Sequence, residues 1–449
     1  MRQYMNLSNL LGAAILAALL PAIIGVSPLP VGAQQTQRAL LSAETLIKAA
    51  RAALAEGKLD DAEFLLKGVK PGEGNIDDLD FLHGTIALAR RNWPDAIDRF
   101  RAMLARNPDL PRVRLDLALA YFQTGEDGNA AYHFRLALGS KDLPDVVRAR
   151  ALGFLDQIRR RKRWSITGSL AVLPDSNINA ATSARLVDLF GLPARLSDDA
   201  RQTSGVGLSV NVAGGYEGRI SEDLRFRVGG ELRTRTYDES DFNEQLVSLR
   251  AGPRFLFEKF DLRTELTSRL RWLGGKRYSR ATGVELSSDW LVAPTSRLSA
   301  SVGGERISYD TFLGDGYSYG THLGLRHALG RATLLRVDTS FRRQTLDRDA
   351  YSWDEFSIGV SVKREFPLGF VLSAGPSYRR RVYGAPLPIF GPEPRVDGTL
   401  AGHVKVSNRH VSLFGFMPEV TIRYERRDSN LDLYDYDRTA GEVGVVRTF

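Results

Sequence analysis

Beyond residue 163, hydrophobic and polar positions alternate with a period of two. Between Leu224 and Arg235 apolar side chains are separated by charged ones, and the same rhythm returns near residues 262, 335 and 356. Such alternation predicts strands with one apolar and one wet face. The pattern recurs to the end of the chain without a helical segment to cover the apolar faces. It therefore predicts an antiparallel transmembrane β-barrel over 163–449 with a charged lumen, the alternative being a soluble all-β domain.

The spacing of turn residues predicts about fourteen strands and their direction. Links after even-numbered strands are short, whereas several after odd-numbered strands are long and rich in Asp, Tyr, Gly and Pro. Outer-membrane barrels have short periplasmic turns and long outer loops, so the barrel and all that precedes it start in the periplasm. Tyrosines near the loops, Tyr237, Tyr278, Tyr309, Tyr351 and Tyr383, are expected to form an interfacial girdle. The expected strands are 164–173, 203–216, 223–236, 244–257, 259–273, 277–292, 295–309, 315–328, 331–343, 352–364, 366–381, 395–407, 410–427 and 438–449.

Residues 40–162 have a helical period and repeat every 34 positions. Ala62, Ala96 and Ala130 share this spacing, as do Leu66, Phe100 and Phe134. Small and large residues at such spacing are typical of tetratricopeptide repeats, which stack into a solenoid with a concave face. We expect a periplasmic repeat domain over 40–162, closed by a last helix at 144–162. A helical spacer without a ligand is the alternative to a surface that docks a polypeptide. The candidate repeat-groove residues are Trp93, Phe100, Tyr121 and Phe134.

The first 33 residues are expected to be a secretory signal peptide. An apolar stretch from Leu10 to Val26 is followed by small residues at Val31 and Ala33, which suits cleavage after Ala33. An uncleaved membrane anchor is the alternative. The expected location is the bacterial outer membrane, with the N-terminal domain in the periplasm.

Composition narrows the chemistry that is available to the chain. It has no cysteine, and its net charge is +8. Export removes nucleic acid as a partner of this basic chain and favours anionic lipid and lipopolysaccharide. The expected partners in biogenesis are periplasmic chaperones and the barrel-assembly machinery, which reads a terminal aromatic such as Phe449.

Signals of catalysis are weak. Gly316 to Gly320 spells G-x-S-x-G, but that motif needs a strand–turn–helix elbow, and here it opens an alternating strand. The six histidines have no metal-ligand spacing on a shared strand face. We therefore expect no enzyme activity, no catalytic residue, no cofactor and no metal site.

The order of segments, together with one motif, resembles a known family. Trp164 opens the first strand, and Asp175-Ser176-Asn177-Ile178-Asn179 follows it. This is similar to the D-S-N-x-N segment of the surface lipoprotein assembly modulator (Slam) family. The resemblance implies a translocation helper that delivers a client, a surface lipoprotein or a secreted scavenging protein, across the outer membrane. The repeats would dock the client, and the barrel would provide the route. A polysaccharide export porin and a nutrient-uptake channel are the alternatives.

The segment from Asp175 to Gln202 has two interpretations. Its short polar residues could form Asx-type turns that end a strand, or the whole segment could fold into the lumen as a plug or client contact. Lumen charges also have two interpretations, mutual pairing or a net positive path for an anionic passenger. The lumen charges considered are Arg225, Arg227, Arg233, Arg263, Arg269, Arg271, Glu231, Asp261 and Glu265. The candidate plug or client contacts are Asp175, Ser176, Asn177, Asn179, Leu189 and Phe190.

Overall fold

The structure is a computed structural model that describes residues 41–140, 142–161, 163–189, 191–409, 411 and 415–448. The expected signal peptide at 1–33 lies outside the described residues. The chain divides into two compact units, one reaching to Met103 and the other Leu104–Phe449. The helices end at Arg161, and the strands begin at Trp164. The division into compact units falls earlier, because the last helices pack with the barrel.

The first unit contains α1 (Ala43–Ala55), α2 (Leu59–Lys67), α3 (Ile76–Ala89) and most of α4 (Trp93–Arg106). Helix α1 is capped by Ser42, whose hydroxyl accepts the Thr45 amide at 3.2 Å. Gly84 on α3 faces the Phe100 ring so closely that an added Cβ would lie 2.7 Å from it. The small residue therefore sets how near α3 and α4 can approach. The core of this unit comprises Ile47, Ala50, Ala62, Leu66, Leu82 and Ile86.

The helices of the second unit are α5 (Pro111–Thr124), α6 (Asp127–Leu138) and α7 (Asp145–Arg161). Phe134 of α6 stacks on Phe154 of α7 at 5.2 Å between ring centroids. The 34-residue spacing also fixes the helix ends. Gly57, Arg91 and Gly125 have φ of 77°, 61° and 81°, so each repeat turns through a left-handed residue at the same place. This confirms the tetratricopeptide pattern, and α7 confirms the expected last helix.

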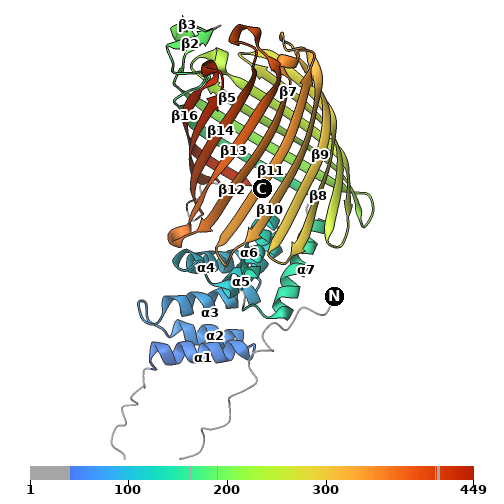
Figure 1. Cartoon of the computed structure of the whole chain (residues 1–449). Coiled ribbons are helices and arrows are strands. Elements are labelled where there is room, and N and C mark those ends of the chain that lie inside the picture. The colour runs from blue at the N-terminus through green and yellow to red at the C-terminus, as the bar shows by residue number, and fades with distance from the viewer. Residues whose placement is uncertain are drawn as a thin grey trace, which may run out of the picture. The chain divides into compact units, whose positions relative to one another are not determined.

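Fourteen antiparallel strands close into a barrel in the order β1-β16-β15-β14-β13-β12-β11-β10-β9-β8-β7-β6-β5-β4 (Figure 1). The closing pair joins β1 to β16, with Leu170 opposite Val445. The predicted fold class is confirmed. The strands are β1 (Trp164–Asp175), β4 (Gly205–Arg219), β5 (Leu224–Tyr237), β6 (Glu244–Leu256), β7 (Phe260–Leu273), β8 (Lys276–Ala293), β9 (Ser296–Tyr309), β10 (Asp315–Ala328), β11 (Thr333–Leu346), β12 (Trp353–Glu365), β13 (Phe370–Pro386), β14 (Pro394–Asn408), β15 (Met417–Ser429) and β16 (Tyr436–Thr448).

Apolar side chains point outward from the barrel and charged ones inward. On β7, Leu266 is 66% exposed whereas its neighbour Glu265 is 3% exposed. The expected tyrosine girdle needs a correction. Tyr237 and Tyr309 point inward, where each is hydrogen-bonded to a polar side chain. The exposed tyrosines of the barrel wall are Tyr216, Tyr317, Tyr319, Tyr378 and Tyr424.

Turns at one end of the barrel are mostly short, and loops at the other are mostly longer. Three strand boundaries differ from the prediction by four residues or more. The strand expected from residue 410 begins at Met417, and that expected over 366–381 runs from Phe370 to Pro386. A small hairpin, β2 (Leu186–Leu189) and β3 (Leu192–Arg195), was not predicted; its turn uses Gly191 at φ 74°. Among the described residues, no helix is long and apolar enough to cross a membrane.

Candidate functional site

Helices α5–α7 lie at the short-turn end of the barrel (Figure 1). A charge cluster around the buried Glu365 attaches them there. Glu365 ends β12, and its carboxylate accepts the Tyr132 hydroxyl at 2.7 Å. Arg114 of α5, fully buried, lies 2.5 Å from the same carboxylate, and Arg409 lies 3.4 Å from it. The Arg409 guanidinium also stacks over the Tyr132 ring at 3.9 Å. We call these four residues the Glu365 cluster.

The cluster joins two helices to two barrel turns, and its Arg114 and Glu365 side chains are buried. Burial raises the pKa of the Tyr132 hydroxyl, which therefore remains a hydrogen-bond donor at neutral pH. Arg114 donates to the Pro108 carbonyl at 2.6 Å as well, so its guanidinium is held from both sides. Removing one member of such a group would leave a buried charge without its partner, which costs about 3–5 kcal/mol.

The end of α6 lies directly on the turn between β10 and β11. A Cβ added to Gly139 would lie 2.5 Å from the Gly330 carbonyl oxygen, so only glycine fits here. In the same turn, Arg331 pairs with Asp142 at 3.0 Å and donates to the Asp109 carbonyl at 3.4 Å. This turn is the second attachment of the helices to the barrel.

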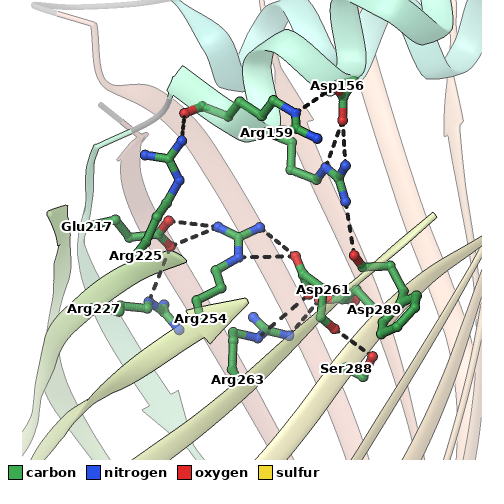
Figure 2. A network of polar contacts seen from close by, with 12 residues as sticks. Asp156, Arg159, Glu217, Arg225, Arg227, Arg254, Asp261, Arg263, Ser288 and Asp289 are labelled. Carbon is green, nitrogen blue, oxygen red and sulfur yellow. Dashed lines mark hydrogen bonds and ion pairs between the residues drawn. The ribbon is translucent and has the colours of Figure 1, made fainter. Parts of the chain in front are cut away.

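Helix α7 supplies the third attachment, through Arg159, which Figure 2 labels, and the next residue, Arg160. Arg159 donates to the Phe260 and Glu258 carbonyls at 3.2 and 3.3 Å, and Arg160 pairs with Asp223 at 3.0 Å. Asp156 holds both arginines, at 2.5 and 2.9 Å. Burial of Asp156 opposes its ionisation, but hydrogen bonds from the two arginines outweigh burial and lower the pKa of its carboxyl.

Between these helices and the barrel wall lies a cavity of about 1160 Å³. Helices α6 and α7 contribute Tyr132, Arg135 and Arg159, and the strands contribute mainly polar and charged side chains such as Lys363 and His403. The helices therefore lie across one end of a wet lumen. A passenger that used the lumen would have to displace them or pass beside them.

One side of the lumen wall is braced by alternating charges, which Figure 2 shows around Arg254. Arg254 lies between Glu217 and Asp261, at 2.7 and 2.5 Å. Arg227 lies 3.2 Å from Glu265, and Arg263 lies 2.6 Å from Asp289.

The remaining lumen arginines that the sequence singled out also have acceptors. Arg225 donates to the Arg160 carbonyl of α7, and Arg233, Arg269 and Arg271 pair with Glu231, Glu305 and Glu244 at 2.7, 2.5 and 2.8 Å. For these arginines the structure supports mutual pairing. The sequence did not single out Glu217, Arg254 and Asp289, although their inward position on alternating strands could have shown them.

At the long-loop end, the Asp175–Asn179 motif forms a set of turns against β16. Asp175 pairs with Arg438 at 2.5 Å and accepts the Asn177 amide at 2.9 Å, which is an Asx turn. The Asn177 side chain is fully buried and donates to the carbonyls of Ala181 and Asp437 at 2.9 and 3.1 Å. The motif therefore fastens the first strand to the last at the barrel seam.

The rest of the motif holds the two ends of the long loop together. The Ser176 hydroxyl accepts the Thr439 amide at 2.8 Å. Asn179 donates to the Arg201 carbonyl at 2.7 Å and accepts the Thr203 amide at 3.1 Å. Within the described residues, these contacts favour the turn interpretation of the motif over a contact surface.

The apolar insert does not extend down the lumen. Its hairpin β2–β3 lies beside the short helical turns η5 (Pro388–Phe390) and η6 (Asp432–Tyr434), which belong to neighbouring loops at the long-loop end. Phe190 and the side chain of Leu189 lie outside the described residues. A plug formed by this hairpin inside the lumen does not agree with its place among the loops.

The candidate repeat-groove residues are mostly buried. Phe100, Phe134 and Tyr121 are 0%, 2% and 7% exposed, so they fill the spaces between helices and offer little surface to a client. Trp93, at the start of α4, is half-buried. Sequence reasoning overlooked Phe64 on α2, which is 77% exposed, and Arg114, a charge on the apolar face of α5 that the helical period could have revealed.

Metal-ligating side chains are not clustered in the part of the chain that the structure describes. No group of three or more His, Asp or Glu side chains there could hold a metal ion. Ser318 of the G-x-S-x-G match lies inside β10, paired on both sides with β9 and β11 and without the elbow that such a nucleophile needs.

The fold, together with the attachment of α5–α7 to the short-turn end of the barrel, defines an outer-membrane β-barrel with a periplasmic tetratricopeptide domain. A family model described as surface lipoprotein assembly modifier matches residues 164–449, and a tetratricopeptide repeat model matches residues 81–144. The chain belongs to the surface lipoprotein assembly modifier family. This confirms the resemblance found in the sequence and the outer-membrane location, with the short turns and the helices on the periplasmic side.

Relatives with this name are similar over most of their length. The surface lipoprotein assembly modifier of Pasteurella multocida is 22% identical over 396 residues, which cover 83% of this chain and 76% of that one. Surface lipoprotein assembly modifier 1 of Neisseria meningitidis is 22% identical and covers 82% and 75%. Among solved structures, OmpT of Vibrio cholerae covers 64% of this chain and 97% of its own at 10% identity, with a TM-score of 0.37.

Proposed function

We propose that this protein delivers a client lipoprotein across the outer membrane to the cell surface. The observation that carries the proposal is the attachment of α5–α7 across the periplasmic end of the barrel lumen. A periplasmic client that reaches α5–α7 would thereby be placed at the entrance of the barrel. The names of the related proteins, which describe surface lipoprotein assembly, support the same conclusion.

In this proposal the repeats hold the client before it crosses. A repeat solenoid offers a polypeptide-binding face, and exposed aromatic side chains contribute most to such contacts. Trp93 and Phe64 are the candidate contacts, since one is half-buried and the other exposed. We expect Phe64→Ser and Trp93→Ala to weaken client capture, whereas Ile76→Ser, at another exposed apolar position, serves as the matched control.

The barrel provides the route, and α5–α7 must leave its periplasmic end for the lumen to be used. A chain that enters incompletely folded and folds outside would acquire direction from folding alone. Cleavage of residues 1–33 and assembly by the barrel-assembly machinery and periplasmic chaperones are further parts of this proposal. Lipopolysaccharide and outer-membrane lipid would surround the exposed apolar wall.

The experiment is deletion of the gene, followed by antibody staining of intact cells for the lipoprotein encoded beside it. The proposal expects surface staining to fall while the total amount of the lipoprotein is unchanged. Re-expression of the full-length protein should restore staining. Undiminished staining in the deletion strain, with the lipoprotein still sensitive to added protease, would overturn the proposed function.

A further inference from the structure

Arg135, Arg297 and Arg326 differ from the lumen arginines described above. Arg326 lies directly opposite Arg297 on β9 and opposite Arg336 on β11, so three neighbouring strands carry arginines in one row. All three line the cavity under the helices, and Arg135 of α6 lines the same cavity. Like charges directly opposite each other destabilise a sheet unless a group of opposite charge lies between them.

Only one arginine of this row has an acidic partner. Arg336 is held by Asp338 at 2.5 Å, and the nearby Asp289 holds Arg263 at 2.6 Å. Within the described ranges, Arg135, Arg297 and Arg326 make no ion pair or hydrogen bond. Each of the lumen arginines described above, in contrast, has a carboxylate or carbonyl acceptor.

The three unpaired arginines influence one another across the cavity. Burial and the positive charges of Arg297 and Arg326 lower the pKa of Arg135 to about 10, so its guanidinium is still charged at neutral pH. A helix and two strands thus aim three cations at one space. Guanidinium groups present planar pairs of donors that match the oxygens of a carboxylate or a phosphate.

We propose that Arg135, Arg297 and Arg326 form an anion-binding site at the periplasmic entrance of the lumen, which receives carboxylates of an acidic segment of the passenger polypeptide. The identity of the passenger rests on the proposed function; the anion site does not. The site lies directly behind α6, in the cavity at the periplasmic end of the barrel. Because Arg135 of α6 adds to the arginines of the strands, the site would hold such a segment more tightly while the helix remains docked.

The test measures binding of fluorescently labelled hexaglutamate to the purified full-length protein in detergent at low salt. Hexaglutamine is the uncharged control peptide. The site predicts saturable hexaglutamate binding that salt weakens, and no binding of hexaglutamine. Arg297→Gln together with Arg326→Gln should weaken binding about 100-fold, near tenfold for each charge-assisted contact that is lost.

A matched variant separates this site from the general charge of the lumen. Arg269→Gln with Arg271→Gln also removes two lumen cations, but both are already paired, with Glu305 and Glu244. It should change the affinity by less than about threefold. Arg135→Gln, on the helix rather than the barrel, should weaken binding about tenfold and provides a second variant if the strand substitutions disturb folding.

Several results would overturn the inference. Absence of hexaglutamate binding, or an equal loss in the paired-arginine variant, would remove the site. If inorganic phosphate saturates the site and hexaglutamate does not compete, the acidic-segment assignment fails. Because this assay contains no export step, its outcome is independent of the deletion experiment that tests the proposed function.

Discussion

Replacement of Glu365 by glutamine should release α5–α7 from the barrel. The substitution keeps the shape of the side chain but removes the charge that Arg114, at 2.5 Å and fully buried, and Arg409, at 3.4 Å, both face. The Tyr132 hydroxyl also loses a charged acceptor at 2.7 Å. The buried Arg114 guanidinium would then lack the carboxylate that faces it.

The magnitude follows from the burial of the cluster. Removing one partner of a buried ion pair costs about 3–5 kcal/mol. At 1.36 kcal/mol for each factor of ten, the detached population should rise by about two to three and a half orders of magnitude. The contacts of Arg331, Arg159 and Arg160 remain in the variant, so this is an upper value for full detachment.

Two assays report detachment. Trypsin cleavage within α7 follows the detached population when reattachment is fast, and it should accelerate about 100-fold. In planar bilayers the variant should spend more time in an open, ion-conducting state, because the helices lie across the lumen cavity. Arg114→Gln should have a similar effect and should not add fully to Glu365→Gln, since the two residues act on one contact.

The control is Glu355→Gln on the same strand. Glu355 pairs with Arg381 at 2.5 Å, and both residues belong to the barrel, so the loss of this pair does not touch the helices. If Glu365→Gln is cleaved and conducts like the wild type, or if Glu355→Gln behaves in the same way as Glu365→Gln, the Glu365 cluster does not hold the helices in place.

Three further outcomes test other parts of the structure. Asn177→Ala removes three hydrogen bonds of about 1 kcal/mol each at the barrel seam. In a heat-modifiability gel, the variant should lose its folded mobility at a lower temperature than the wild type. Asn129→Ala, at an exposed position, should not change this temperature. Arg91→Gly should stabilise the repeats by about 1 kcal/mol in thermal unfolding followed by circular dichroism, because Arg91 has φ 61° where the other repeats use glycine, and Gly57→Ala should destabilise them. The pKa of Asp156 is lowered from 3.8 in the folded protein, so its contribution to holding α7 is present above pH 3.8 and is lost as the pH falls below that value. Protection of the α7 amides from hydrogen exchange should therefore decline below pH 3.8 in the wild type. The Asp156→Asn variant should not show this decline.

Local patterns explain how much of the fold the sequence predicts. Alternation sets which face of each strand meets lipid, because successive side chains point to opposite sides. The 34-residue spacing identified residues that are now buried between helices, such as Ala96 and Phe100, and the turn interpretation of Asp175–Asn179 needed only short-range bonding. Each of these features is decided within one or two elements.

The attachment of the helices depends on residues far apart in the chain. Tyr132 and Glu365 are separated by 233 positions, and no local sequence pattern around either residue predicts that they are in contact. Strand parity places Arg297 and Arg326 inside the barrel, but only the register of β9 on β10 shows that they face each other. The hairpin at Leu186–Arg195 was missed because four-residue strands are too short for alternation to identify.

The most direct test of this account is to fasten the helices to the barrel and follow the client. The chain has no cysteine, so Asp142→Cys with Arg331→Cys, whose native side chains lie 3.0 Å apart, can be joined by a short bis-maleimide without side reactions. The account predicts that the cross-linked protein stays folded in the outer membrane and no longer delivers lipoprotein to the cell surface, while either single-cysteine variant treated with the same reagent does. Undiminished surface delivery by the fully cross-linked protein would contradict a route that opens when α5–α7 leave the lumen.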